Sequence, residues 1–178
     1  MQTSKASVDV VLRQAGAADA AGLAAHAELT FRLAWSAFNR QQDMDDYCGE
    51  HFTPDAVAAD LASKGVRVVL AESEGALVGY LKTVEGAPCL DLPATLPIEI
   101  ARCYVTPAWH GRGVAEAMML HTLKRVRESG CDLLWLAVWE QAPRARAFYA
   151  RHGFSMVGRL PFQLGQDLQE DLVVARRP

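Results

Sequence analysis

A glycine-containing turn between an apolar strand and a helix is the segment of the sequence best suited to bind an anion. Gly111, Arg112 and Gly113 follow the strand-like segment 98–105 and precede the helical pattern of 114–130. Glycine permits backbone conformations and close approaches that a side chain would block. The first N–H groups of a helix have no partner within it, and the helix dipole adds positive potential. The turn therefore predicts a pyrophosphate site, to which Arg112 would add a charge-assisted hydrogen bond.

The same residues also fit a tight turn whose glycines are only structural. Gly-Lys-Ser/Thr, which a Walker loop requires, does not follow the turn. A Rossmann fingerprint would lie on the first strand of a repeated βαβ unit, which this turn does not. The turn alone therefore leaves the binding and the structural interpretations open.

The elements that position this turn follow from hydrophobic patterning and turn residues. Segment 8–13 alternates like a strand, and Asp19 caps an alanine-rich helix that runs to about Phe31. A second amphipathic helix is expected from Trp35 to Tyr47. Thr53, Pro54 and Asp55 form a typical helix start, and Gly65 is expected to close that helix.

The second half of the chain alternates strands with two helices. The apolar segments 66–72 and 76–85 predict an antiparallel hairpin, and helix 114–130 follows the strand 98–105. Segment 132–138 is almost continuously apolar, as expected for a strand buried on both faces beside a parallel neighbour. A short helix from Pro143 to Arg151 and the strands 154–160 and 170–176 complete an α+β, or mixed α/β, fold. No linker divides residues 1–178, so we expect a single domain.

Composition excludes several classes of protein. The chain has 178 residues, of which 51% are hydrophobic and 22% charged, as in soluble globular domains. No apolar run reaches the length of a membrane span, and the first residues lack a signal-peptide pattern, so we expect a cytoplasmic protein. A net charge of −3 disfavours nucleic acid as a partner. The four cysteines have neither C-x-x-C spacing nor a nearby histidine cluster, which predicts free thiols and no metal.

The turn resembles motif A of the GNAT acetyltransferase superfamily, Gln/Arg-x-x-Gly-x-Gly/Ala after a strand. His110 stands at the first position, Gly113 at the central glycine and Ala115 at the final small residue. His110 departs from the motif, but most of the contacts that the motif makes come from backbone N–H groups.

A downstream segment, LAVWEQAPRARAFYARHGF, resembles motif B of the same superfamily. Ala142 stands where the motif has asparagine, which removes one hydrogen bond. The positions that match are Ala145, Phe148, Tyr149, Gly153 and Phe154. The resemblance covers roughly residues 66–176.

The resemblance implies a mostly antiparallel sheet with one splayed parallel pair of strands, and acetyl-CoA as cosubstrate. It implies that the backbone of Cys103, Tyr104 and Val105 pairs with the pantetheine arm as an added strand would. The remaining cofactor contacts that it implies are His110, Gly111, Arg112, Gly113, Val114, Ala115, Ala142 and Tyr149.

The resemblance also implies two catalytic residues for direct acetyl transfer to a primary amine. Glu99 lies where some members place a general base that acts directly or through water. Tyr149 matches the general acid that protonates the departing thiolate. The structural alternative for Glu99 is a strand-end carboxylate paired with Arg102 or a lysine, and that for Tyr149 is a core aromatic. Cys103 could also be an acyl-accepting nucleophile, but it has no obvious His or Asp partner in the sequence. Trp135 and Trp139 are expected in the core rather than at the substrate.

The acceptor amine is less well defined. The chain resembles bacterial spermidine/spermine N-acetyltransferases in Val138-Trp139-Glu140, in MDDYCGEHFTPDAVAADL and in the closing FQLGQDLQEDLVVA, with its Gly165, Asp167, Gln169 and Asp171. Acid at Asp43, Asp45, Asp46 and Glu50 would steer a polycation, although a solvated acidic face explains it too. A protein N-terminus or an antibiotic amine is an alternative acceptor, and a non-catalytic acetyl-CoA sensor is an alternative function. The oligomeric state, a homodimer included, stays open.

Overall fold

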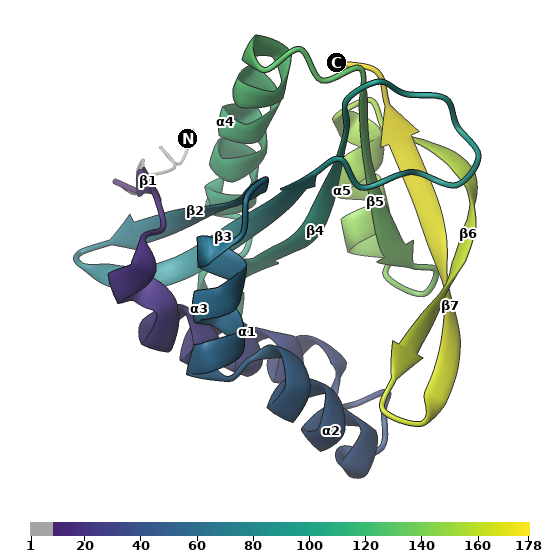
Figure 1. Cartoon of the computed structure of the whole chain (residues 1–178). Coiled ribbons are helices and arrows are strands. Elements are labelled where there is room, and N and C mark those ends of the chain that lie inside the picture. Colours follow the sequence, from purple (N-terminus) through teal and green to yellow (C-terminus); the bar gives the residue numbers. More distant parts are fainter. Residues whose placement is uncertain (1–8) are drawn as a thin grey trace, which may run out of the picture.

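One seven-stranded sheet organises the protein, which the computed structural model describes from residue 9 to residue 178. The strands are β1 (Val11–Gln14), β2 (Val66–Ser73), β3 (Ala76–Glu85), β4 (Pro97–Val105), β5 (Leu133–Trp139), β6 (Ser155–Leu164) and β7 (Asp167–Arg176). Their order is β1-β2-β3-β4-β5-β7-β6, and every pair is antiparallel except β4 with β5 (Figure 1). This is the α+β architecture with one parallel pair that the sequence predicts.

Helices cover both faces of the sheet (Figure 1). The helices α1 (Ala20–Trp35), α2 (Gln41–His51) and α3 (Pro54–Ala62) share one apolar core with β2 and β3. The helices α4 (Val114–Glu128) and α5 (Pro143–Arg151) share a second core on the opposite face. The loop between β3 and β4 covers part of β5 and β7, where the Trp135 indole donates to the Ala87 carbonyl at 2.9 Å. Two short 3-10 turns, η1 (Ala17–Asp19) and η2 (Pro107–Trp109), precede α1 and α4.

The parallel pair separates after three residues. β4 pairs with β5 only from Pro97 to Glu99. Immediately beyond, Lys82 of β3 pairs with Arg102 whereas Thr83 pairs with Ile100, which leaves Ala101 as an unpaired bulge residue in β4. A bulge bends its strand and increases the local twist. The rest of β4 therefore diverges from β5 and leaves a gap between the two strands.

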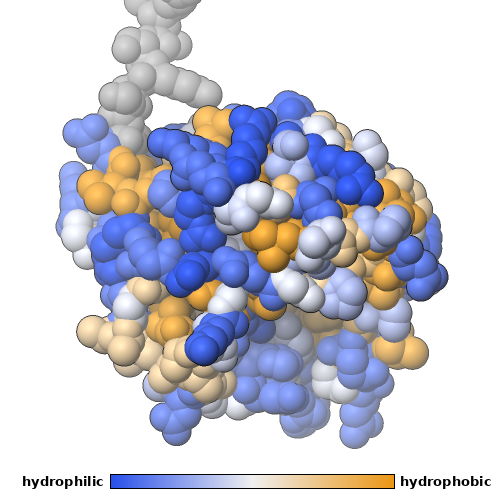
Figure 2. Space-filling view, turned by 45° about the horizontal axis from the view of Figure 1, so that its top comes forward, coloured by the Kyte–Doolittle hydropathy of each residue, from blue (hydrophilic) through white to orange (hydrophobic). Residues whose placement is uncertain are grey.

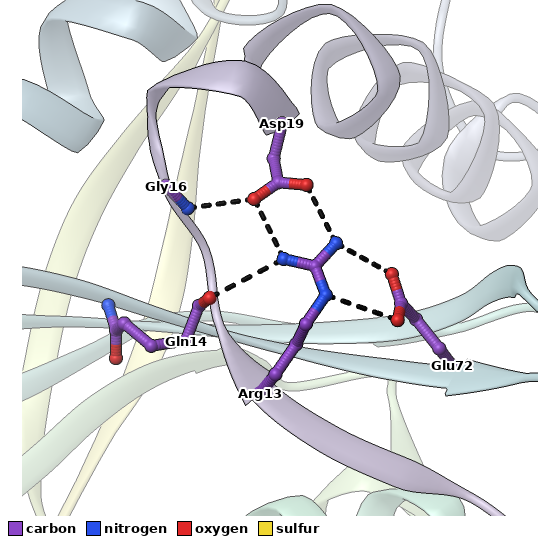
Figure 3. A network of polar contacts seen from close by, with 5 residues as sticks. All are labelled: Arg13, Gln14, Gly16, Asp19 and Glu72. Carbon is purple, nitrogen blue, oxygen red and sulfur yellow. Dashed lines mark hydrogen bonds and ion pairs between the residues drawn. The ribbon is translucent and has the colours of Figure 1, made fainter.

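Arg13 fastens the short edge strand β1 to its neighbours (Figure 3). Its guanidinium lies 2.7 Å from both Asp19 and Glu72, at the start of α1 and on β2 respectively. The Gly16 amide also donates to Asp19, at 2.7 Å. The hydrogen bonds from Arg13, and after them the one from the Gly16 amide, lower the pKa of Asp19 to about 2.

The long β6–β7 hairpin reaches across the molecule to α2 (Figure 1). Asp43 of α2 is only 1% exposed, and it accepts hydrogen bonds from the Gln166 amide at 2.9 Å and from Arg40 at 2.6 Å. Leu164, just before the hairpin turn, is buried in the core of α1–α3. The hairpin is therefore fixed at its tip as well as along its strands.

Most predicted elements are confirmed, with differences at their ends. The helix expected from Trp35 to Tyr47 is wrong in place, because Trp35 ends α1 and a turn separates it from Gln41, where α2 begins. The Asn39 side chain donates to the Trp35 carbonyl at 2.9 Å and so stabilises that turn. Gly65 does not close α3, because that helix ends at Ala62. Gly65 instead lies just before β2, with φ +83°.

Other differences concern the chain ends and the last strands. Of the strand expected over 8–13, Val8 lies outside the described residues, and β1 runs from Val11. β6 and β7 are each ten residues long, longer than the polar alternation of their sequences suggested. Within residues 9–178, the helices are all too short or too polar to cross a bilayer. On the face seen in Figure 2, hydrophilic residues predominate and hydrophobic ones form small, separate patches.

Gly165 is predicted to be essential for the docking of the hairpin. Its φ is +56°, and a Cβ there would lie 2.5 Å from the Asp43 Cα atom. Gly165→Ala should therefore reduce the free energy of unfolding by about 2–4 kcal/mol through steric overlap and backbone strain. Gly75→Ala is the control, since Gly75 has φ +77° but nothing within 4 Å, and it should cost about 1 kcal/mol. Urea denaturation measures both, and equal losses would contradict the docking role.

Candidate functional site

Two cavities meet at the gap between β4 and β5. The larger, which we call the cofactor cleft, has a volume of about 770 Å³ and lies among the turn before α4, the start of α5 and the second half of α1. The smaller, which we call the acceptor cavity, has a volume of about 220 Å³ and lies toward β7 and the β6–β7 hairpin. Cys103, Tyr104 and Tyr149 line both, together with Trp35, Trp139 and Ala145. A ligand in one cavity can therefore meet a ligand in the other.

The turn before α4 has the geometry of an anion site. Gly111 and Gly113 have φ +75° and +87°, which only glycine adopts without strain, and nothing lies within 4 Å of the Cβ position of either. Gly113 is the N-cap and provides no side-chain hydrogen bond to the helix. The N–H groups of the first turn of this 15-residue helix therefore face an open region, in which the helix dipole favours negative charge.

Of the two predicted phosphate ligands with polar side chains, His110 lines the cofactor cleft and Arg112 does not. The ring of His110 contacts the Val105 carbonyl, with Nε2 at 2.8 Å, and so joins the turn to the end of β4. The guanidinium of Arg112 lies 5.2 Å from the centre of the Trp109 ring, outside the lining of the cleft. The arginines that do line the cleft, Arg144 and Arg151, come from α5.

One edge of β4 is open along the gap. Cys103, Tyr104 and Val105 pair with β3 on one side, while no residue of β5 pairs with them on the other. This is the edge that an extended ligand arm would join by main-chain hydrogen bonds. Ala142, at the N-cap of α5, lines the same cleft and has no side-chain cap.

Tyr149 stands at the junction of the two cavities. Tyr149 is 8% exposed, and it lines both cavities together with Cys103. Burial raises the pKa of Tyr149 well above its usual value, so the phenol keeps its proton. Burial also raises the pKa of Cys103 to about 12, which leaves a neutral thiol and disfavours the nucleophile interpretation.

Glu99 lines the acceptor cavity, and it is the last residue of β4 that pairs with β5. Burial raises the pKa of its carboxyl, while the charges of Lys82 and Arg102 oppose that rise. A carboxylate in such surroundings accepts a proton more readily near neutral pH than an exposed one.

Asp171 is a second carboxylate of the acceptor cavity. It lies opposite Trp139 in the β5–β7 pair and opposite Leu160 in the β6–β7 pair. Within residues 9–178, no hydrogen-bond donor contacts its side chain, and burial raises its pKa to about 6. Ala137, although on a central strand, is exposed because it forms part of the cavity floor.

The rest of the acceptor cavity is aromatic. The walls include Trp35, Trp139, Tyr47 and Phe162, and the Trp35 and Trp139 rings meet edge to face at 5.4 Å. Trp135 is buried in the core as the sequence predicts, but the same expectation for Trp139 is wrong, because Trp139 lines both cavities.

The acidic segment of α2 is largely occupied by local contacts. Asp43 is buried against Arg40, and Asp45 lies 2.8 Å from Arg32. Asp46 accepts a hydrogen bond from the Gln42 side chain at 2.8 Å. Three of the four acids expected to steer a polycation therefore already have partners, and none of the four lines the acceptor cavity, whereas Asp171 does.

Two residues that line the acceptor cavity were not assigned to the site from the sequence, although Arg102 was considered as a partner of Glu99. Arg102 lies 4.6 Å from the Phe52 ring and 4.0 Å from Asp60, and it lines the acceptor cavity. Trp35 donates its indole N–H to the Tyr104 hydroxyl at 3.0 Å, which joins α1 to β4. Only the folded chain brings α1, β4 and β7 together, so no local pattern marks these residues.

Comparison with known sequences gives one family. The pattern of the Acetyltransferase (GNAT) family matches residues 29–154. An uncharacterized N-acetyltransferase of Mycobacterium tuberculosis (strain H37Rv) is 29% identical over 158 residues, which cover 89% of this chain and 97% of that protein. Another, from Lactobacillus delbrueckii subsp. lactis, is 27% identical over 83% of this chain and 85% of its own.

Comparison with solved structures gives the same fold. PaiA N-acetyltransferase from Thermoplasma acidophilum, solved with coenzyme A, superposes with a TM-score of 0.79 at 14% identity, over 96% of this chain and 99% of that one. YncA from Salmonella typhimurium, solved with acetyl-CoA, gives a TM-score of 0.61 at 18% identity, over 94% and 93% of the two chains.

Asp171 is predicted to destabilise the folded protein at neutral pH. Its folded-state pKa of about 6 lies above the ordinary 3.8, so ionisation above pH 6 opposes folding, and this cost disappears once both states are protonated. Asp171→Asn should raise the unfolding midpoint at pH 7.5 by about 2–4 °C, allowing for solvent screening, and the gain should shrink toward zero near pH 4.

The matched control for this prediction is Glu170→Gln. Glu170 precedes Asp171 on β7, is exposed, and pairs with Arg159 at 2.8 Å. It should show no gain at pH 7.5. A lower midpoint for Asp171→Asn than for the wild type at pH 7.5 would show that Asp171 makes a stabilising contact instead. Differential scanning calorimetry at several pH values measures the effect.

Proposed function

Because the chain belongs to the acetyltransferase (GNAT) family, as its two motifs predicted, we propose that it transfers the acetyl group of acetyl-CoA directly to a small primary amine. The observation that supports this most strongly is the position of Tyr149. A buried, protonated phenol lies where the cofactor cleft and the acceptor cavity meet.

The cofactor cleft fits coenzyme A in shape and in chemistry. The open N–H groups at the start of α4 suit a pyrophosphate, and the free edge of β4 at Cys103–Val105 suits the amides of a pantetheine arm. Arg144 and Arg151 add positive charge along the same cleft. When bound there, acetyl-CoA supplies the thioester whose carbonyl carbon the amine attacks.

The chain's own residues manage the two protons of the reaction. Glu99 accepts a proton from the incoming ammonium, directly or through water, since an alkyl ammonium has a pKa of about 10.4 and must lose its proton before attack. Tyr149 holds a proton at its phenolic oxygen for the sulfur that departs. The splayed strands hold both reactants in place, which supplies a large part of the acceleration.

The acceptor we propose is a polyamine. A volume of about 220 Å³, closed by the β6–β7 hairpin and α2, suits a slender chain better than a protein segment. Aromatic rings and carboxylates together attract ammonium groups and their methylene chains. We also expect the enzyme to act in the cytoplasm, where its four free thiols stay reduced.

A panel of amines tests this function. The purified protein is incubated with acetyl-CoA and spermidine, a short peptide or an aminoglycoside, and the free thiol released is measured. Spermidine should give at least tenfold more thiol than the protein with acetyl-CoA alone, and more than the other amines. Binding of coenzyme A without amine-dependent thiol release would instead identify a sensor. Release with the peptide or the aminoglycoside alone would identify the other acceptor class.

Tyr149→Phe tests the general acid. Loss of the phenolic proton should lower kcat by about 100-fold or more while the Kd of coenzyme A changes less than twofold, because the ring still fills the junction. Phe148→Leu is the control for disturbance of α5, since Phe148 packs beside Tyr149 without a proton to donate. Stopped-flow thiol assays and calorimetry measure the two constants. An unchanged kcat would remove Tyr149 from the mechanism.

A further inference from the structure

The two carboxylates of the acceptor cavity have different electrostatic surroundings. The charges of Lys82 and Arg102 favour the ionised form of Glu99. No such cation favours the ionised form of Asp171, and burial is the one cause of its raised pKa. In the part of the chain that the structure describes, Asp171 also has no salt bridge and no hydrogen-bond donor. A positive charge brought by a ligand would therefore gain more at Asp171 than at Glu99.

The two carboxylates also lie at different ends of the cavity floor. Glu99 pairs with Trp135 on β5, and Asp171 is opposite Trp139 on the same strand. Four residues along a strand correspond to about 13 Å. A ligand that carries two separate nitrogens can therefore place one of them near each carboxylate.

The surroundings of Asp171 suit an alkyl ammonium. Trp139 is its cross-strand neighbour, and Phe162 lines the same cavity. Aromatic faces attract cations, and a partly desolvated carboxylate beside them adds charge and a hydrogen-bond acceptor. The cation of the cavity itself, Arg102, is held away by its stacking on Phe52 at 4.6 Å.

We propose that Asp171 binds a second ammonium group of the acceptor and thereby makes the enzyme selective for amines with two or more positive charges. The inference rests on the proposed function and adds its specificity-determining residue. The second amine keeps its proton at neutral pH, because an alkyl amine has a pKa of about 10.4. The first amine reacts at the junction beside Tyr149, with Glu99 as the base.

A pair of probes that differ by one amine tests this proposal. We compare 1,4-diaminobutane with n-butylamine, which has the same carbon chain. The wild type should show at least a tenfold higher kcat/KM for the diamine, and Asp171→Asn should reduce that preference below about twofold, mainly through KM. Glu170→Gln, on the opposite face of β7, should retain the preference. Glu99→Gln should lower kcat with both amines alike, which separates a base from an anchor.

A binding measurement keeps the proposal testable without turnover. Calorimetric titration of the coenzyme A complex with each amine should show the same tenfold preference for the diamine in the wild type, and none in Asp171→Asn. If no amine is acetylated but this preference is present, the proposed function fails and the role of Asp171 stands. If the wild type shows no preference, or Asp171→Asn retains it, the role of Asp171 is overturned, whatever the turnover.

Discussion

The separation of β4 from β5 is the constraint on which the rest of the structure depends. Only three residue pairs join the two strands before the Ala101 bulge turns β4 away. A parallel sheet that stayed paired would use the backbone groups of Cys103–Val105 internally and leave no passage between its faces. Because the strands part, one edge of β4 stays open to a ligand, and the cofactor cleft and the acceptor cavity communicate.

The bulge also decides which side chains face each cavity. Without an extra residue, alternation would place Glu99 and Cys103 on the same face of β4. With Ala101 inserted, Ile98, Ile100 and Cys103 contact the core of α4 and α5. Tyr104 contacts the core of α1–α3 instead. A single inserted residue therefore places Glu99 on one face of the sheet and the Cys103 thiol on the other.

The sequence predicts the cofactor side of the molecule far better than the acceptor side. The turn at Gly111–Gly113, the start of α4 and the short helix with Tyr149 are local patterns, so glycine positions and helix capping were enough to place them. The acceptor cavity draws on α1, α2, β4, β5 and the β6–β7 hairpin, which meet only in the folded chain. From the sequence, an aromatic residue of its walls, such as Trp139, is equally well explained as a core residue. An acidic residue is equally well explained as part of a solvated face. The acids of α2 stood out by number, yet two ion pairs and one hydrogen bond occupy three of the four, whereas Asp171 was named only within the closing segment that resembles polyamine acetyltransferases.

The two sides also differ in how their stability relates to their function. The cofactor cleft uses backbone N–H groups that a helix start leaves free in any case, so the fold loses little by providing them. The acceptor cavity keeps Asp171 half-buried without a partner, which opposes folding at neutral pH. The wall that holds it is in turn fixed by the docking of the hairpin tip on Asp43, through a hydrogen bond of 2.9 Å to the Gln166 amide. The hairpin thus carries both Gln166, whose contact with Asp43 stabilises the fold, and Asp171, whose carboxylate destabilises it. A rigid hairpin can hold an unpaired charge in position until an ammonium group compensates it, whereas a loose one would let that carboxylate turn toward water.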